Sequence, residues 1–314
     1  MGERTVAVLA GGLSHEREVS LRSGRRLAAD LRDVGAVVSE WDADAGLLDR
    51  LRTERPEAVL IALHGGDGEN GAVQSVLEML DVPFVGSGSR ACRLAWDKPT
   101  AKAEIARAGL HTPDWVTLPH ATFRELGARG VLDAMVSRLG LPMMIKPDQG
   151  GSALGARLVR DAEDLPAAMV DCLAYGTAVL AERYITGTEV AVSVIADPTP
   201  RALPVVEVCA KGGVYDYTAR YTQGATTFPC PARLDPDVLR AAEQAALEVH
   251  RLLGLRDLSR TDAIVTEDGT VVVLEVNTFP GLTETSLLPT AMATEGEHLG
   301  QLFSTLIDEA IRRS

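Results

Sequence analysis

The chain has 314 residues, of which 46% are hydrophobic and 24% charged, and its formal net charge is −13. This length suggests two or three domains with cores of ordinary size. The acidic balance argues against nucleic acid as a partner, although a local basic pocket can still hold a nucleotide. No stretch approaches a membrane-spanning length and the chain enters a predicted strand directly, so we expect a cytoplasmic protein without a membrane partner. Four scattered cysteines predict reduced thiols.

The first part of the chain alternates strands with helices. We expect strands at residues 4–10, 37–41, 58–63 and 83–85, and helices at 17–34, at 47–55 and up to residue 80. Such alternation predicts a parallel sheet with helices on both faces. Ligands of these sheets bind beyond the carboxyl ends of the strands, which is where Glu16 and His64 lie.

A change of pattern around Gly86-Ser-Gly88 predicts a domain boundary. Beyond it we expect helices at residues 98–108 and 131–139 and strands at 115–117, 143–146, 155–159, 178–184, 189–196 and 204–210. The predicted domains are 1–88, 89–182 and 183–314. Residues 211–234 form a connection too long for an ordinary loop, and three tyrosines within it favour an active-site lid over a surface loop.

Residues 260–277 predict a β-hairpin with polar side chains on one face. Two β-rich runs, at 261–266 and 270–276, flank the two-residue turn Asp268-Gly269. Counting outward from this turn pairs Glu267 with Thr270, Ile264 with Val273, Asp262 with Glu275, and Arg260 with Asn277. Opposed carboxylates repel, so we expect one or two hard cations such as Mg²⁺ there, with Asp262, Glu275 and Asn277 as ligands. The alternative is a solvated face bridged by Arg260, but the apolar run at 271–274 indicates a buried strand.

Lysine is rare in this arginine-rich chain and occurs only at positions 98, 102, 146 and 211. An ammonium group is a compact point charge suited to phosphate oxygens. Lys146 emerges from a predicted buried strand into a loop, which favours a functional role over a lysine at the edge of the core. For Lys98, beside the predicted N-cap Asp97, the two interpretations are balanced, and Lys102 is expected at the surface.

The segment Gly150-Gly-Ser-Ala-Leu-Gly155 joins two predicted strands. Its three glycines and one serine suit a loop that covers phosphates through backbone amides. A plain hairpin turn would look similar, and the upstream Lys146 favours the phosphate-binding interpretation. The chain contains no Gly-x-x-x-x-Gly-Lys-Ser/Thr motif, so a nucleotide would not be held by a P-loop.

A lysine-bearing strand pair, a glycine-rich loop and an acidic hairpin together resemble the ATP-grasp architecture. Six segments narrow the resemblance to the D-alanine–D-alanine ligase family: Gly11-Gly-Leu-Ser-His-Glu-Arg-Glu-Val-Ser20, Ala62-Leu-His-Gly65, Gly68-Glu-Asn-Gly71, Gly86-Ser-Gly88, Tyr215-Asp-Tyr-Thr-Ala-Arg-Tyr221, and Glu275-Val-Asn-Thr-Phe-Pro-Gly-Leu-Thr283. They occur in order over nearly the whole chain. The resemblance implies an α/β and α+β protein with an ATP-grasp fold and an N-terminal parallel α/β domain.

The resemblance also implies a reaction, its cofactors and its partners. ATP would phosphorylate the carboxylate of one D-alanine, and the amine of a second would attack the acyl phosphate to give D-alanyl-D-alanine for peptidoglycan. The implied ligands are ATP, D-alanine and two Mg²⁺ or Mn²⁺ ions, and the implied assembly is a homodimer. The residues implied in nucleotide binding are Lys98, Lys146, Glu182, Glu189 and Arg220, and the implied metal ligands are Asp262, Glu275 and Asn277.

Further residues are implied in catalysis and substrate binding. By resemblance, Glu16 holds the first amino group in a network with Ser152 and Tyr221, although a carboxylate at a helix start is also favoured by the helix dipole. The implied catalytic residues are Glu16, Ser152, Tyr221, Arg260, Gly281 and Ser286. The implied substrate contacts are Glu16, His64, Arg260, Ser286 and Leu287.

Two positions depart from the family pattern. Ala153 replaces the second of two serines, and Arg220 stands where the lid usually carries lysine. Both concern phosphate contacts, and they leave room for a specialised paralogue that uses another amino acid or hydroxy acid. A Rossmann dehydrogenase is a more distant alternative, suggested by the first strand and Gly11-Gly12. Its glycine pattern is incomplete here, and it would leave the acidic hairpin unexplained. A non-catalytic nucleotide-binding regulator is the third alternative.

Overall fold

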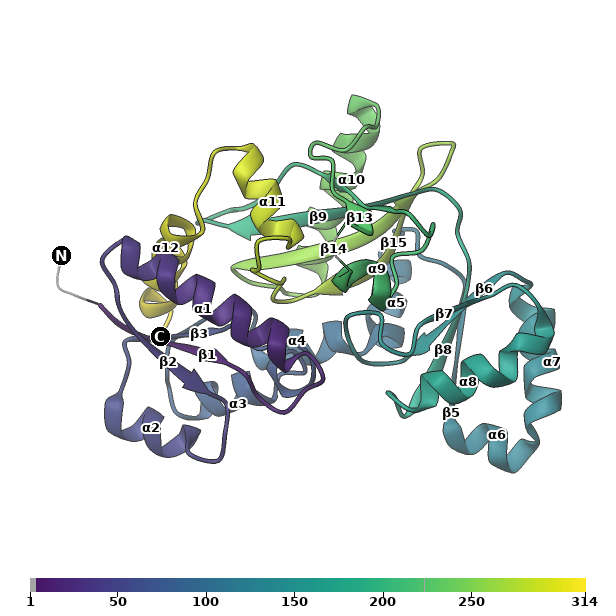
Figure 1. The fold of residues 1–314 in the computed structure, drawn as a ribbon, viewed down its shortest axis with the longest axis horizontal. Helices are drawn as coiled ribbons and strands as arrows, with labels where there is room; N and C mark the ends of the chain where they lie inside the picture. Colours follow the sequence, from purple (N-terminus) through teal and green to yellow (C-terminus); the bar gives the residue numbers. More distant parts are fainter. Residues whose placement is uncertain (1–3, 223) are drawn as a thin grey trace.

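The computed structural model describes residues 4–222 and 224–314, with only the backbone described for Tyr221. Within these residues the strands form a four-stranded N-terminal sheet, a four-stranded central sheet, a five-stranded C-terminal sheet and a two-stranded ribbon. Figure 1 shows the N-terminal and central sheets at opposite ends of the molecule, with the C-terminal sheet between and above them. The mixed α/β and α+β fold is as predicted.

The N-terminal sheet is parallel, with strand order β2-β1-β3-β4, as its alternating elements predict. Its apolar strands are covered on one face by α1 and the C-terminal α12, and on the other by α2 and α3. The elements are β1 (Thr5–Ala10), α1 (Arg17–Asp33), β2 (Val37–Asp42), α2 (Leu47–Glu54), β3 (Ala58–Ile61), α3 (Ala72–Met79) and β4 (Phe84–Val85).

The central sheet is antiparallel, with strand order β5-β8-β6-β7. Three helices, α6 to α8, bury their apolar side chains against it. The elements are β5 (Trp115–Pro119), α6 (His120–Leu126), α7 (Ala128–Leu139), β6 (Met143–Pro147), β7 (Arg157–Val159), α8 (Leu165–Leu173) and β8 (Ala178–Arg183). The strand predicted at 178–184 therefore pairs with the predicted lysine strand, which brings Glu182 beside Lys146.

The C-terminal sheet contains β9 (Thr188–Ala196), β10 (Pro200–Ala202), β11 (Val206–Glu207), β14 (Leu258–Val265) and β15 (Val271–Asn277). The single strand predicted at 204–210 is wrong, because β11 pairs with β9 whereas β12 (Cys209–Ala210) pairs with β13 (Thr226–Thr227). The chain therefore leaves the sheet within this segment and enters residues 211–234, called the lid region here after its predicted role, which carry α9 (Tyr217–Tyr221). Three further helices follow the lid: α10 (Pro236–Leu252), α11 (Leu287–Thr294) and α12 (Leu299–Arg312).

Two helices connect the predicted domains rather than belonging to one of them. The predicted helix at 98–108 forms as α5 (Lys98–Arg107), preceded by α4 (Ser89–Trp96). Both helices pack their alanines and Ile105 against α10 and β15. Because α5 contacts the C-terminal sheet through β15 and the central sheet through the pair of Lys102 with Glu182, the domain limits at residues 88 and 182 stay a prediction.

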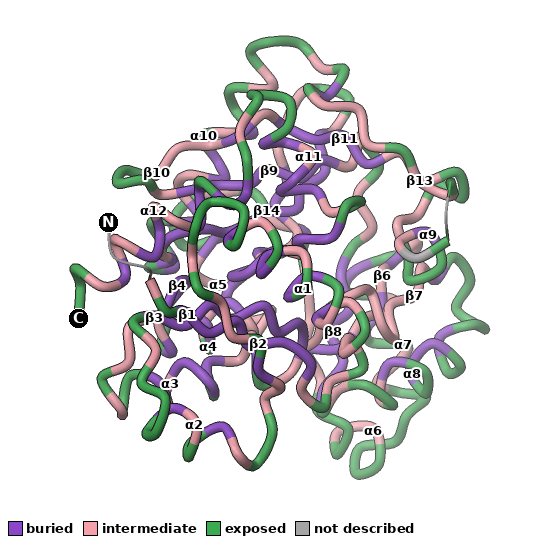
Figure 2. The backbone as a smooth tube through the Cα atoms, turned by 60° about the vertical axis from the view of Figure 1, so that its left-hand side comes forward, coloured by how far each residue is buried: buried purple, intermediate pink, exposed green. Residues whose placement is uncertain are grey.

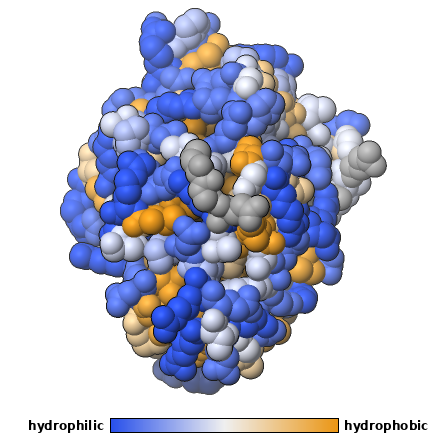
Figure 3. Space-filling view, turned by 90° about the vertical axis from the view of Figure 1, so that its left-hand side faces the viewer, coloured by the Kyte–Doolittle hydropathy of each residue, from blue (hydrophilic) through white to orange (hydrophobic). Residues whose placement is uncertain are grey.

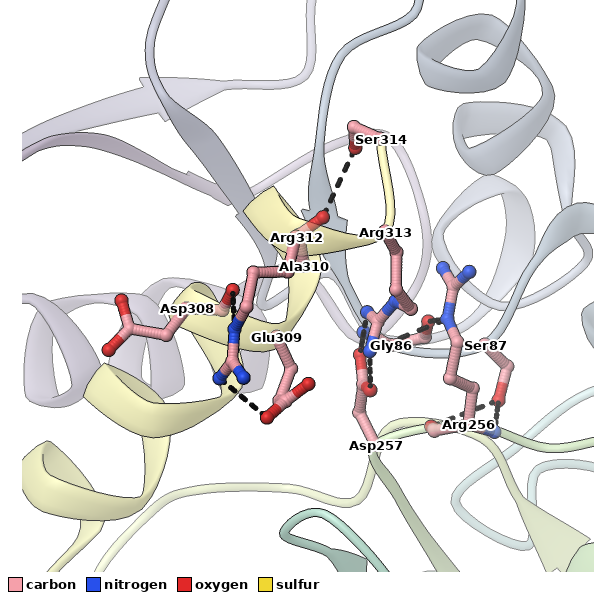
Figure 4. Close-up of polar contacts among 10 residues, drawn as sticks. All are labelled: Gly86, Ser87, Arg256, Asp257, Asp308, Glu309, Ala310, Arg312, Arg313 and Ser314. Atoms are coloured by element: carbon pink, nitrogen blue, oxygen red, sulfur yellow. Dashed lines mark hydrogen bonds and ion pairs between the residues drawn. The ribbon is translucent and has the colours of Figure 1, made fainter.

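A polar junction connects the N-terminal sheet to the C-terminal sheet (Figure 4). The fully buried Asp257 accepts hydrogen bonds from the Gly86 amide at 2.7 Å and from both terminal nitrogens of Arg313 at 2.6 and 2.8 Å. The neighbouring Arg256 donates through Nε to the Gly86 carbonyl at 2.8 Å. The end of β4, the start of β14 and the C-terminus thus meet at one carboxylate.

Burial follows the strands, and the surface is largely polar. Figure 2 shows β1, β9 and β14 as mainly buried chain. The face in Figure 3 is mostly hydrophilic with a few small apolar patches. Among the described residues, no helix has both the length and the apolar character needed to cross a membrane.

Candidate active site

A cavity of about 640 Å³ lies between the central and C-terminal sheets, under the lid region. Charged side chains from both sheets line it, whereas Met144, Leu158, Ile185 and Leu274 supply an apolar part. An apolar slot beside a charged wall is suited to a ligand with an aromatic base and phosphates. The charged lining residues are Lys98, Lys146, Arg157, Glu182, Arg183, Glu189, Glu207, Asp216, Arg220, Asp262 and Glu275.

The hairpin of β14 and β15 carries the predicted polar face. Arg260 pairs with Asn277 and Asp262 with Glu275, which confirms both predicted pairs. The pairs predicted nearer the turn are wrong, because Val273 pairs with Ala263. The Gly269 amide bonds to the Thr266 carbonyl, so the turn is a three-residue loop, and Gly269 has a φ of 83°. An irregularity between Asp262 and Ala263 shifts the register back by one residue.

The acidic face is buried and already balanced by cations. Arg260 holds Asp262 with two hydrogen bonds of 2.6 and 2.8 Å, and Asn277 donates to the same carboxylate at 3.2 Å. Asp262 and Arg260 are only 7% and 8% exposed, so this part of the face is not open to solvent, although Arg260 does bridge to Asp262 as the alternative expected. Burial alone would raise the pKa of Glu275, but the charges of Lys98, Lys146, Arg220 and Arg260 lower it to about 2.

These residues fit a hard cation by the chemistry of their donors. Two carboxylates stand opposite each other, one of them held ionised, and an amide lies beside them. Among the described residues, no three His, Cys, Asp or Glu side chains are grouped closely enough to hold an ion by themselves. A divalent ion at this face would therefore need ligands from a substrate or water as well.

A buried row of charges runs from Lys146 and Glu182 at the cavity wall to Lys102 behind it. Glu182 is 2% exposed and pairs with Lys146 at 2.7 Å and with Lys102 at 2.8 Å. The expected surface position of Lys102 is wrong, because it is 1% exposed and also donates to Thr112 at 2.6 Å. Burial would raise the pKa of Glu182, but the two ammonium groups lower it. Burial lowers the pKa of Lys102 to about 8 despite the attraction of Glu182.

Lys102→Met should weaken the fold and raise the KM for ATP. The variant leaves Glu182 buried with one cation, and breaking a buried ion pair from one side costs about 3–5 kcal/mol. The remaining partner, Lys146, would then be drawn more strongly to Glu182 and away from the cavity. Thermal unfolding and ATP-dependent rates would be compared with Lys211→Met, whose lysine is exposed in the lid region. Equal unfolding midpoints in the two variants would show that Lys102 does not stabilise the fold.

Lys98 and the glycine-rich loop meet at the open side of the cavity. The Lys98 ammonium contacts the Gly150 carbonyl and lies 3.6 Å from Glu275. Asp97 caps α5 as predicted, by accepting from the Thr100 amide at 2.9 Å. The structure therefore brings Lys98, Lys146 and Glu275 to one cavity, although they come from three separate segments.

Glu189 and Arg220 face the same cavity from β9 and the lid. Burial raises the pKa of Glu189 to about 7. The Arg220 guanidinium lies 4.2 Å from the ring centre of Tyr215, a cation–π contact that fixes the base of the lid. The side chain of Tyr221 lies outside the described part of the structure.

Glu16 joins the N-terminal sheet to the glycine-rich loop. Glu16 is the N-cap residue of α1, as the alternative of a helix-start carboxylate expected, but its side chain makes no cap hydrogen bond and instead accepts one from Ser152. A side chain at Gly65 or Gly151 would come within 2.3 or 2.8 Å of its Oε2, so both glycines leave room for it. Burial and the charge of Glu69 raise its pKa, against the opposing effect of Ser152 and His64.

His64 is buried beside Glu16, at the carboxyl end of β3. Its Nε2 lies 2.9 Å from the hydroxyl of Ser23, and its Nδ1 lies 3.7 Å from Glu69. Sequence reasoning missed Ser23 and Glu69 in this site. Glu69 lies in the quoted Gly68-Glu-Asn-Gly71 segment and could have been found there, whereas Ser23 looks like any buried serine of an amphipathic helix.

Residues 278–286, the loop between β15 and α11, carry the remaining predicted site residues and contact α1 rather than the cavity. The Ser286 hydroxyl accepts from the Thr283 amide at 3.0 Å and lies 2.9 Å from the Thr283 hydroxyl. A side chain at Gly281 would meet Ser286 Oγ at 2.9 Å, so glycine leaves room for the hydroxyl in its present position. Leu287 begins α11 and is buried.

The sheets, the cavity between them and its paired carboxylates and lysines define an ATP-grasp type of enzyme. Two family models match the chain, "D-ala D-ala ligase C-terminus" over residues 105–308 and "D-ala D-ala ligase N-terminus" over residues 39–87. The chain belongs to the D-alanine–D-alanine ligase family.

Similar proteins cover nearly the whole chain. It is 40% identical to a D-alanine–D-alanine ligase of Desulforudis audaxviator (strain MP104C) over 99% of both chains. It is 41% identical to one of Anaeromyxobacter dehalogenans (strain 2CP-1 / ATCC BAA-258), covering 98% of this chain and 97% of the relative. A D-alanine–D-alanine ligase of Bacillus anthracis solved in complex with ATP matches with a TM-score of 0.79 and 27% identity, covering 98% of this chain and 96% of that one.

Proposed function

We propose that this protein joins two D-alanine molecules to give D-alanyl-D-alanine for peptidoglycan synthesis, converting ATP to ADP and phosphate. The observation that carries the proposal is the cavity between the two sheets, where Lys98, Lys146 and the acidic hairpin face converge. The relatives of similar length, all named for this reaction, support it. A plain nucleotide-binding regulator would not need the Glu16 carboxylate of the N-terminal domain bonded to Ser152 of the glycine-rich loop.

The nucleotide occupies the cavity in this proposal. Its base lies in the apolar part near Ile185 and Leu274, with Glu182 and Glu189 reading the base and the ribose. Lys98, Lys146 and Arg220 neutralise the phosphates, because phosphoryl transfer to a carboxylate requires charge on both partners to be screened. Asp262, Glu275 and Asn277 would hold one or two Mg²⁺ or Mn²⁺ ions, which screen phosphate charge when bound.

The two amino acids bind on the other side of the phosphates. Glu16 receives the ammonium of the first D-alanine, supported by Ser152 and, by resemblance, by Tyr221. His64 lies near this subsite.

The second substrate and the developing negative charge are held by other residues. Arg260 and the Gly281 amide stabilise the oxyanion formed when the second amine attacks the acyl phosphate. Ser286 and Leu287 hold the carboxylate of the second D-alanine. The homodimer and the cytoplasmic location stay predictions.

One assay tests the function against its alternatives. The protein is mixed with ATP, Mg²⁺ and D-alanine, and phosphate and dipeptide are measured together, with D-serine and D-lactate offered as competing acceptors. Equal amounts of phosphate and D-alanyl-D-alanine are expected. Phosphate release that requires another acceptor would support a specialised paralogue, and no release with any acceptor would contradict a ligase.

Tyr221→Phe should acquire measurable D-alanyl-D-lactate synthesis, whereas the unaltered protein ignores D-lactate at neutral pH. In our proposal the hydroxyl of Tyr221 closes the lid over Glu16 and favours an amine acceptor. Losing one buried hydrogen bond costs roughly 1–3 kcal/mol, enough to change acceptor preference without ending activity. Competition assays with both acceptors measure the ratio of ester to amide, and Tyr217→Phe on the same helix is the control. An unchanged ratio in Tyr221→Phe would exclude this role.

A further inference from the structure

The buried hydroxyl of Ser23 lies between the two proposed amino-acid subsites. Ser23 comes from the middle of α1 and is fully buried. Its Oγ lies 2.9 Å from His64 Nε2 and accepts a hydrogen bond from the Leu282 amide at 3.3 Å. One hydroxyl therefore contacts the histidine near the first subsite and the loop at residues 278–286 near the second.

The same face of α1 holds this loop at two further points. Arg26 donates to the Leu282 carbonyl at 3.1 Å, and Arg22 lies 3.5 Å from Glu284. Residues three and four apart share one face of a helix, so Arg22, Ser23 and Arg26 point to the loop together. Both the amide and the carbonyl of Leu282 are thus bound from α1, which restricts the peptide planes that follow Gly281.

The Ser23 contacts also orient the imidazole of His64. The Ser23 hydroxyl bonds to Nε2 while Nδ1 faces Glu69, so both ring nitrogens of His64 have a partner and the plane of the ring is set. The His64 carbonyl is fixed separately by the Ser14 hydroxyl at 2.5 Å. Loss of the Ser23 hydroxyl would therefore release the ring and the loop but not the backbone of residue 64.

We propose that Ser23 is a positioning residue for the acceptor subsite: with Arg26, it fixes the Gly281–Leu282 segment so that the second amino acid binds in register with the first. The inference rests on the proposed function, because it takes residues 281–287 as the acceptor subsite. Ser23 itself touches no substrate. It acts through the Leu282 amide and the His64 ring.

Four variants of the full chain test the proposal, and Ser20→Ala is the matched control. Ser20 also lies on α1, is fully buried and makes two hydrogen bonds of 2.8 Å, to the Ala62 carbonyl and from the Gly11 amide. Losing either hydroxyl should cost similar stability, but only Ser23 contacts the 278–286 loop. Ser23→Thr keeps the hydroxyl, and Arg26→Met removes the second contact to Leu282 from a partly exposed position.

Initial rates measured over a range of D-alanine concentrations give separate KM values for the first D-alanine, the donor, and the second, the acceptor. Ser23→Ala should raise the acceptor KM about five- to tenfold, the effect of one lost hydrogen bond, with the KM for ATP changed less than about twofold. Arg26→Met should shift the acceptor KM in the same direction, Ser23→Thr should restore it in part, and Ser20→Ala should leave the ratio of the two KM values unchanged. Equal changes in Ser23→Ala and Ser20→Ala, or a normal acceptor KM in Arg26→Met, would overturn the proposal.

A second measurement needs no turnover. The ¹⁵N chemical shifts of the His64 ring should change in Ser23→Ala and stay unchanged in Ser20→Ala, because only Ser23 bonds to the ring. Unchanged shifts in Ser23→Ala would contradict the positioning role whatever the reaction is. A wild-type protein without D-alanine-dependent phosphate release would instead contradict the proposed function, so the two failures are distinguishable.

Discussion

Glu275→Gln should abolish ligation, lowering the rate by about 1,000-fold or more, while leaving the fold intact. Glu275 is a charged oxygen donor held ionised by four surrounding cations, so an amide of the same shape removes the charge that a divalent ion needs. The variant ends the repulsion between Glu275 and the opposing Asp262, but it also loses the attraction to four cations, which is the larger effect because it lowers the pKa of Glu275 to about 2. The protein should therefore still fold but unfold at a lower temperature at neutral pH.

The assay measures phosphate release over a range of Mg²⁺ and Mn²⁺ concentrations. Glu267→Gln, on the exposed turn of the same hairpin, is the matched control and should keep full activity. Normal turnover of Glu275→Gln at saturating metal would show that Glu275 is not a ligand.

Arg260→Lys should lower the rate by about 100-fold or more with little change in the KM for ATP. The guanidinium of Arg260 binds Asp262 through two nitrogens, and in our proposal the same fork faces the oxyanion. An ammonium group is a point charge with different geometry, so it cannot make the paired contact and reach the oxyanion together. The pKa of Arg260 is raised above its ordinary value, because Asp262 outweighs burial, so the charge stays constant at every working pH.

Rates with saturating ATP and D-alanine measure this loss. The control is Arg251→Lys, which changes an exposed arginine on α10 and should have no effect. Near-normal turnover of Arg260→Lys would place Arg260 outside the reacting site.

Much of the acidic hairpin could be predicted from sequence, because its contacts are local. The pairs Asp262–Glu275 and Arg260–Asn277 follow from alternation along two strands joined by a short turn. The residue pairs predicted between the polar face and the turn were wrong, because the turn has three residues instead of two. A register irregularity cancels this difference before the polar face, and side-chain periodicity does not reveal such a compensation.

The sequence by itself determined the alternating elements of the N-terminal sheet, the polar face of the hairpin and the residues that resemble the family. Only the tertiary structure decided that Lys102 is buried, because its partner Glu182 arrives on a distant strand and neutralises the cost of burial. It also decided that Ser23 meets Leu282, 259 residues along the chain. Periodicity shows that a helix face is buried, but the partner of that face is set by how separate elements pack.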